Sequence, residues 1–309
     1  APTKNYDIAM GRGNRVIKRM YTLGWIDQKT YEEATNELPT VYDDTLTQNL
    51  APFIVDEVFR RAKAIGIKDL RTGGYEIYTS IDIRLQHSAQ EAIKHAYEAS
   101  LKRIEGYIIE DANRSNKDEV SNEVNTTLLN GSLVSLDSKT GDILALVGSY
   151  DYKVSSYNRA TQGRRQPGSA FKPFIYQVAI DLGYSGATQL VDIAKTYEYK
   201  KGEETLKWQP KNYEKNYKGL VSLREALVHS RNLATINLVG EIGLSELLKE
   251  FKKFNIKNLP HDLSVSLGTL SLSPLELAKY YTSFANHGLQ VEPHLILSIE
   301  KNNKKIYEK

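Results

Sequence analysis

The feature that most constrains the fold is a change in sequence texture at Gly131. Residues 132–137 and 142–148 are rich in β-forming side chains, and the short turn Asp137-Ser138-Lys139-Thr140-Gly141 joins them, which predicts a β-hairpin. Helical patterns follow, over about 170–182, 222–229, 233–242, 244–254 and 274–287. This order predicts an α+β domain with an antiparallel sheet.

The residues before Gly131 form a different region. Helical spacing of apolar residues runs from 14 to 38 with a break at Gly24, and again over about 50–65. Residues 75–81 alternate like a strand and lead into a helix over about 83–100. Two polar stretches, 104–126 and 195–219, are expected to form loops, the first of them a poorly ordered insertion. The length of 309 residues fits about two domains.

Composition excludes several classes of function. The 41 Lys and Arg residues against 38 Asp and Glu give a net charge of +3 that is spread along the chain, which argues against nucleic-acid binding. The chain has no cysteine, so it has no disulfide, no thiolate metal site and no cysteine nucleophile. Its six histidines show no metal-ligand spacing, and we expect neither a metal nor a cofactor. No apolar run approaches the ~18 residues of a membrane span.

The segment Gln166-Pro167-Gly168-Ser169-Ala170-Phe171-Lys172 is the first candidate for chemistry. A Pro-Gly turn places Ser169 at the start of a helix, and the i+3 spacing brings Lys172 to the same face. A lysine can accept the serine proton if burial and a neighbouring cationic group lower its pKa. The alternative is an N-cap serine with an exposed lysine. A second Ser-x-x-Lys, Ser298-Ile299-Glu300-Lys301, lies in a strand-like context and is interpreted as chance.

The second candidate is the tripeptide Ser230-Arg231-Asn232, which precedes an apolar helix. Its hydroxyl could relay a proton from Lys172, and its amide could hold a substrate amide. The alternative for Ser230 is again a helix cap. The neighbouring His229 is expected to pack rather than to act as a base.

Together these residues resemble the class A, high-molecular-weight penicillin-binding proteins. The resemblance is carried by Gly163 to Phe174, by Trp208-Gln209-Pro210-Lys211-Asn212-Tyr213, by Leu223 to Asn232 and by Ser273-Pro274-Leu275-Glu276-Leu277-Ala278. Upstream it extends to Tyr78-Thr79-Ser80-Ile81-Asp82 and to Asn14-Arg15-Val16-Ile17.

The resemblance implies a transpeptidase domain of the penicillin-binding-protein and serine β-lactamase-like fold, an antiparallel sheet flanked by helices, at residues 129–309. A small linker domain (39–128) and the end of a glycosyltransferase domain (1–38) would precede it. Ser169 would attack the D-Ala-D-Ala end of a peptidoglycan stem peptide, or a β-lactam. Lys172 would take its proton, Ser230 would pass a proton to the leaving amine, and Asn232 would hold Lys172 and the substrate.

The third motif of the family, Lys-Thr/Ser-Gly, follows the second, but the only Lys-Thr-Gly here is Lys139-Thr140-Gly141, before Ser169. We interpret it as a turn and expect the third motif on a missing C-terminal segment. We also expect truncation at the N-terminus, because the chain begins with Ala1-Pro2. A membrane anchor would lie upstream of Ala1 and would place the protein on the outer face of the bacterial membrane.

Four other functions share these motifs. A serine β-lactamase would turn over penicillin, although the 128 upstream residues argue against it. A DD-carboxypeptidase would use water as the acceptor. A β-lactam-sensing receptor would be acylated without releasing D-Ala from a peptide, and an inactive structural relative would not be acylated.

Overall fold

The computed structural model describes residues 6–37, 50–67, 69–114, 129–201 and 204–309 and divides the chain into two compact units, 1–52 and 53–309. The helices are α1 (Tyr6–Thr22), α2 (Gln28–Asn36), α3 (Pro52–Ala64), α4 (Ile83–Arg114), α5 (Lys172–Asp181), α6 (Leu223–Val228), α7 (Asn232–Ile242), α8 (Leu244–Glu250) and α9 (Pro274–Ala285), with 3₁₀ turns η3 (Gly168–Phe171), η4 (Phe251–Phe254) and η5 (Leu263–Leu267). The strands are β1 (Tyr75–Thr79), β2 (Leu133–Leu136), β3 (Ile143–Val147), β4 (Gln189–Asp192), β5 (Tyr197–Lys201), β6 (Glu204–Trp208), β7 (Gly219–Ser222), β8 (Ile296–Lys301) and β9 (Lys304–Glu308).

The first unit holds the helix pair α1 and α2, as the break at Gly24 predicts. Gly24 has a φ of 71°, a left-handed conformation that glycine adopts without a side-chain clash. Asp27 then caps α2 by accepting a hydrogen bond of 2.8 Å from the backbone N–H of Thr30. The rings of Tyr21 and Tyr31 stack between the two helices, with centroids 4.8 Å apart.

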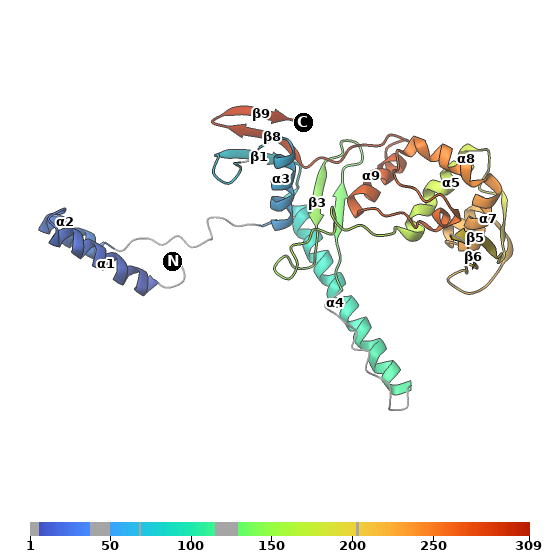
Figure 1. Ribbon diagram of the computed structural model, residues 1–309, viewed down its shortest axis with the longest axis horizontal. Helices are drawn as coiled ribbons and strands as arrows, with labels where there is room; N and C mark the ends of the chain where they lie inside the picture. Colours follow the sequence, from blue (N-terminus) through green and yellow to red (C-terminus); the bar gives the residue numbers. More distant parts are fainter. Residues whose placement is uncertain (1–5, 38–49, 68, 115–128, 202–203) are drawn as a thin grey trace. The chain divides into compact units, whose positions relative to one another are not determined.

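In the second unit the predicted hairpin is confirmed, because β2 and β3 pair antiparallel around the turn at residues 138–140. Helix α4 packs against β3 (Figure 1). The side chain of Gln86 on α4 fastens this contact: its amide donates to the carbonyl of Leu146 at 3.1 Å and accepts from the Leu146 N–H at 2.8 Å. The buried polar edge of β3 is therefore satisfied by a helix side chain.

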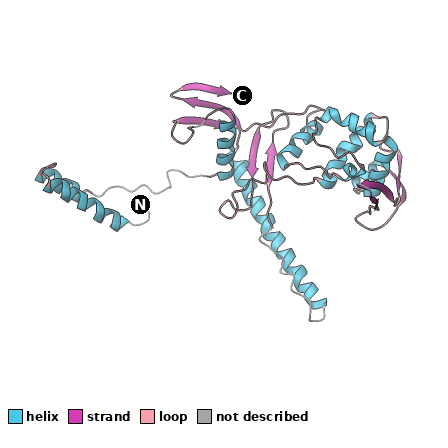
Figure 2. Ribbon diagram, in the orientation of Figure 1, coloured by secondary structure: helices cyan, strands magenta, loops and turns pink. Residues whose placement is uncertain are grey.

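A three-stranded antiparallel sheet joins distant parts of the sequence, in the order β1-β8-β9. Its register runs from Tyr75 opposite Lys301 to Thr79 opposite Ile296. The strand predicted at 75–81 is confirmed, and Figure 2 shows it beside the two C-terminal strands. The second Ser-x-x-Lys copy, residues 298–301, lies within β8 of this sheet.

Two loop predictions are wrong. Residues 195–219 contain the hairpin of β5 and β6, whose Lys- and Tyr-rich strands carry too little apolar alternation to be recognised as strands. The polar stretch 104–126 begins as helix, because α4 continues to Arg114; residues 115–128 lie outside the described residues. From composition alone, a polar stretch that continues a helix cannot be distinguished from a polar loop.

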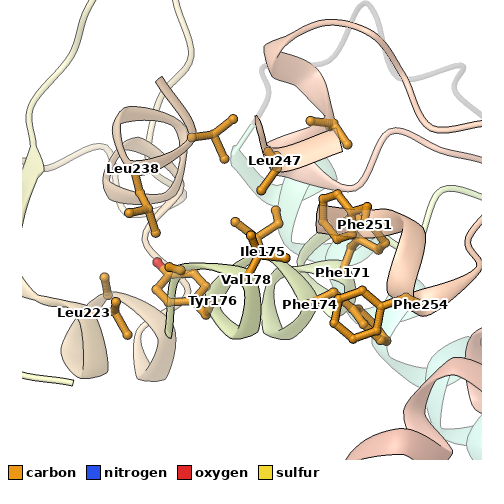
Figure 3. Packing of buried hydrophobic residues seen from close by; sticks show 14 of the residues in the cluster. Phe171, Phe174, Ile175, Tyr176, Val178, Leu223, Leu238, Leu247, Phe251 and Phe254 are labelled. Atoms are coloured by element: carbon orange, nitrogen blue, oxygen red, sulfur yellow. The ribbon is translucent and has the colours of Figure 1, made fainter. Parts of the chain in front are cut away.

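The main core of the second unit surrounds α5 (Figure 3). Phe171 packs on Phe251 with ring centroids 5.4 Å apart, and Phe174 meets Phe254 edge to face at 5.4 Å. Most of α5 is buried, which is why its first residue, Lys172, is drawn into the interior. Among the described residues, no helix is both long and apolar enough to cross a membrane.

Candidate active site

Ser169 lies on η3, immediately before α5, in a turn built by two glycines. Gly168 has a φ of 58°, and its N–H donates to the carbonyl of Gly268 at 3.2 Å. A Cβ on Gly268 would clash with the carbonyl oxygen of Gly168, so only glycine allows this approach. Ser169 is exposed, and its hydroxyl has no hydrogen-bond partner within the described part of the chain. The turn's N-cap position is occupied by Pro167, so the alternative of a capping serine does not hold.

Lys172 is buried, with only 1% of its surface exposed. Its ammonium group donates to the carbonyl oxygen of Ser230 at 2.7 Å, to the Oγ of Ser230 at 3.1 Å and to the Oδ1 of Asn232 at 2.7 Å. All three acceptors are neutral, and burial lowers the pKa of Lys172 from 10.5 to about 8. The sequence suggested burial together with a neighbouring cation; burial is the cause that the structure supplies. The alternative of an exposed lysine is wrong.

Ser230 contacts Lys172 from the loop between α6 and α7, and Asn232 does so from the first residue of α7. Ser230 has a φ of 50°, a left-handed conformation that is unfavourable for a residue with a Cβ. The N-cap position of α7 belongs to Arg231 and has no side-chain cap, so Ser230 does not serve as a helix cap. The amide of Asn232 donates to the carbonyl of Lys211 at 3.1 Å, which leaves its oxygen turned to Lys172.

A cavity of about 330 Å³ opens beside this cluster. Its walls are formed by Ser169, Asn212, Tyr213, Glu214, His229, Ser230, Arg231 and Asn232. The structure thus brings the candidate nucleophile and the Ser-x-Asn loop to one cavity, with the Lys172 amine hydrogen-bonded to that loop. It shows no hydrogen bond between Ser169 and Lys172 in the described residues. His229 is exposed on the cavity wall, so the expectation that it packs is wrong.

Sequence reasoning missed the residues that hold this loop from behind. Arg231 is 3% exposed and pairs with Asp192, which is fully buried at the end of β4. Asp192 also accepts from the side chain of Asn212 at 2.9 Å. Arg231 lies between the two candidate residues of the motif, immediately before an apolar helix. A charged residue in that position was the sequence signal that could have indicated a buried ion pair.

The cluster can carry out proton transfer. At a pH near 8 about half of a group with this pKa is neutral, and a neutral amine accepts a proton from a hydroxyl. The N-terminal end of η3 and α5 adds partial positive charge at Ser169. Among the described residues, no group of three or more histidine, aspartate or glutamate side chains could hold a metal ion. Lys139-Thr140-Gly141 lies in the turn between β2 and β3, as interpreted from the sequence.

Comparison with known proteins agrees with this arrangement. The family model of the penicillin binding protein transpeptidase domain matches residues 131–309. Penicillin-binding protein 1A of Aquifex aeolicus is 33% identical over 363 residues, covering 97% of this chain and 49% of that protein. Penicillin-binding protein 1A of Neisseria flavescens is 42% identical over 175 residues, covering 56% of this chain and 22% of that protein. The chain therefore spans about half the length, or less, of these curated relatives.

Solved structures share the fold of this chain. The crystal structure of penicillin-binding protein 1A from Haemophilus influenzae superposes with a TM-score of 0.79 at 25% identity, over 100% of this chain and 57% of that one. Penicillin-binding protein A from Mycobacterium tuberculosis, solved as a penicillin G acyl-enzyme complex, shares the fold with a TM-score of 0.54 at 22% identity, over 82% of this chain and 64% of that one. The chain belongs to the class A penicillin-binding proteins and carries their transpeptidase domain.

Proposed function

We propose that this chain is the peptide-cross-linking part of a serine DD-transpeptidase that forms an acyl-enzyme on Ser169. The observation that carries the proposal is the environment of Lys172, a buried lysine that has no carboxylate partner among the described residues. Its pKa is lowered to about 8, and it contacts both candidate residues of the second motif. A buried lysine kept for stability alone would be expected to have a counter-ion.

The Oγ of Ser169 attacks the carbonyl of the penultimate D-Ala of a stem peptide and forms an ester. Lys172 takes the serine proton, and Ser230 passes a proton to the departing D-Ala amine, which leaves as the peptide bond breaks. An amine of a neighbouring stem then attacks the ester, forms the new amide and returns a proton to Ser169 through Lys172. Asn232 holds Lys172 and the substrate amide.

A β-lactam takes the place of the peptide in the first step. We expect its ester on Ser169 to be long-lived. Glu214 lines the cavity, but its carboxylate accepts from Arg231 and from the amide of Asn216, both at 3.1 Å; the described wall of the cavity includes no other acidic side chain that could activate a water for deacylation. The penicillin G acyl-enzyme of the Mycobacterium tuberculosis relative, which shares this fold, supports the proposal.

For the whole protein we propose the domain order that the family resemblance implies. Residues 1–38 end a glycosyltransferase domain, 39–128 form the linker and 129–309 begin the transpeptidase domain. The third motif follows Lys309, and an upstream anchor holds the protein at the outer face of the bacterial membrane. The match to penicillin-binding protein 1A of Aquifex aeolicus, which covers 97% of this chain and 49% of that protein, supports a longer protein in which these residues are one part.

The test is the intact mass of the full-length protein before and after benzylpenicillin, followed by peptide mapping. We expect one adduct on Ser169 and none in Ser169→Ala. Ser298→Ala is the matched control, because Ser298 begins the other Ser-x-x-Lys copy but lies in β8. An unmodified Ser169 in the folded full-length protein would overturn the proposal.

Product analysis with a D-Ala-D-Ala stem peptide then separates the related activities. Cross-linked product with release of D-Ala is the expected result. Release of D-Ala with a hydrolysed peptide and no cross-linked product would indicate a carboxypeptidase. Acylation by the β-lactam without any release of D-Ala from the peptide would indicate a sensor. Rapid loss of the penicillin adduct would indicate a β-lactamase.

A further inference from the structure

We propose that Arg231 and Asp192 are positioning residues, which hold Ser230 in its left-handed conformation and thereby fix the acceptors around Lys172. The inference rests on the proposed function and deepens it. It concerns the back of the Ser230-Arg231-Asn232 loop, on the side away from Lys172.

The guanidinium of Arg231 is fully engaged. Its Nε and Nη2 both donate to the Oδ2 of Asp192, the former at 2.9 Å. Its Nη2 also donates to the carbonyl of Asn216 at 3.0 Å, and its Nη1 donates to the Oδ1 of Asn216 at 2.7 Å and to the Oε2 of Glu214 at 3.1 Å. These five hydrogen bonds match the five N–H donors of the group, so its position is determined from every side.

Asp192 links that guanidinium to the rest of the domain. Its Oδ2 accepts from the backbone N–H of Lys218 at 3.1 Å, and its Oδ1 accepts from the amide of Asn212 at 2.9 Å. Asn212 in turn accepts from the backbone N–H of Leu233, on the first turn of α7, at 3.1 Å. Burial raises the pKa of the Asp192 carboxyl, but hydrogen bonds from Arg231 and Asn212 lower it more, so the net direction is downward and the pair is charged.

Successive side chains of the tripeptide Ser230-Arg231-Asn232 face opposite sides of the loop, one toward Lys172 and the other toward Asp192. Ser230 and Asn232 accept from Lys172, whereas the intervening Arg231 binds Asp192. Lys172 also donates to the main-chain carbonyl oxygen of Ser230. The backbone conformation of Ser230 therefore decides where this acceptor lies. A serine at a φ of 50° persists only where its surroundings over-determine it. The buried pair next to it provides that constraint.

The test compares acylation by benzylpenicillin in the full-length protein and in three variants: Arg231→Lys, Asp192→Asn, and the double variant Asp192→Asn with Arg231→Gln. We expect the limiting acylation rate to fall about 10- to 100-fold in each, as for a small misplacement of a catalytic group. The benzylpenicillin concentration at half-maximal rate changes little, because Arg231 is only 3% exposed on the cavity wall and the exposed wall residues Ser169, Tyr213 and His229 are unaltered.

The double variant separates positioning from stability. It removes both buried charges and leaves two amides, with a smaller side chain in place of Arg231, so its melting temperature recovers toward that of the wild type. Its acylation rate stays low, because a glutamine amide cannot reproduce the five-donor fork. Recovery of both the melting temperature and the rate would show that the pair acts on stability alone and would overturn the inference.

A milder variant keeps the inference testable if the buried substitutions do not fold. Asn216 is exposed, and Asn216→Ala removes one acceptor of Arg231 without removing a charge. We expect a fall of about threefold in the limiting rate, the scale of one hydrogen bond, at an unchanged melting temperature. A wild-type rate in Asn216→Ala and in every buried variant that folds would overturn the inference.

The matched control is the buried pair of Glu57 and Arg61 on α3, whose side chains are 2% and 23% exposed and 2.7 Å apart. Glu57→Gln should lower the melting temperature without changing the acylation rate of the folded protein. A wild type that gives no Ser169 adduct refutes the proposed function. A wild type that is acylated, with folded variants that match its rate, refutes only the positioning role.

Discussion

Two buried cations at the Ser230-Arg231-Asn232 loop have opposite surroundings. Lys172 is 1% exposed and meets three neutral oxygens, whereas Arg231 is 3% exposed and meets the carboxylates of Asp192 and Glu214. A guanidinium keeps its proton in proteins, so a carboxylate beside it adds structure without affecting proton transfer. An amine can lose its proton, and a carboxylate beside Lys172 would oppose that loss.

The comparison indicates how the domain separates two requirements. Fixing the loop needs a permanent charge and a counter-ion, and taking a proton from a hydroxyl needs an amine without one. The tripeptide Ser230-Arg231-Asn232 serves both requirements: Arg231 binds its counter-ion on one side, and Ser230 and Asn232 offer neutral acceptors to Lys172 on the other. Each of the following experiments probes that difference, from the largest expected effect to the smallest.

Replacing each cation by methionine breaks the comparison most directly. Arg231→Met leaves the fully buried Asp192 without its partner, and we expect the free energy of unfolding to fall by about 3–5 kcal/mol. Lys172→Met removes a buried charge that has no counter-ion among the described residues, and Ser230, which supplied two of its acceptors, is exposed to water. Near pH 7 the free energy of unfolding therefore changes by no more than about 1 kcal/mol. Denaturant unfolding of both variants measures the difference. Equal losses would show that the two cations play the same structural part.

The sequence predicted the fold well where apolar periodicity carried the signal. The hairpin of β2 and β3, the helices α5 and α7 and the break between α1 and α2 follow from local patterns. It did not predict the pairing of β1 with β8, because strands more than 200 residues apart leave no local trace of their register. The hairpin of β5 and β6 was missed because its residues are mostly polar.

The candidate site divides in the same way. Ser169, Lys172, Ser230 and Asn232 were proposed from their spacing and from the family resemblance, and the structure brings the last three into hydrogen-bond contact. Asp192 was missed, since a lone aspartate at the end of a short strand looks like a turn residue. The left-handed conformation of Ser230 was missed as well, because a Ser-Arg sequence does not indicate a positive φ.

The stability of the protein at alkaline pH tests the comparison at Lys172. Its pKa is lowered from 10.5 to about 8 in the folded state, so between these values the unfolded chain binds more protons than the folded protein. The contribution of Lys172 to stability therefore rises as pH increases from about 8 to 10.5, by up to about 3 kcal/mol. Below pH 8 the buried charge costs that stability.

Unfolding free energies measured from pH 7 to 11 in the wild type and in Lys172→Met isolate this contribution, because the other titrating groups are shared. The difference between the two proteins should grow in favour of the wild type as the pH rises. A difference that is independent of pH would mean that Lys172 titrates near its ordinary value in the folded protein.

The smallest effect is expected at an ion pair of ideal geometry on the surface. Arg164 lies in the segment that leads to Ser169 and binds Glu276 on α9 through two hydrogen bonds, of 2.8 and 3.1 Å. Its side chain is 49% exposed, against 2% for Arg231. Water can therefore replace most of the hydrogen bonding that the ion pair provides. Arg164→Ala should lower the free energy of unfolding by no more than about 1 kcal/mol. Because Glu276 also caps α9 through the N–H of Ser273 at 2.7 Å, that helix end stays fixed without the arginine. A loss as large as that of Arg231→Met would mean that geometry, rather than burial, sets the strength of these two arginine pairs.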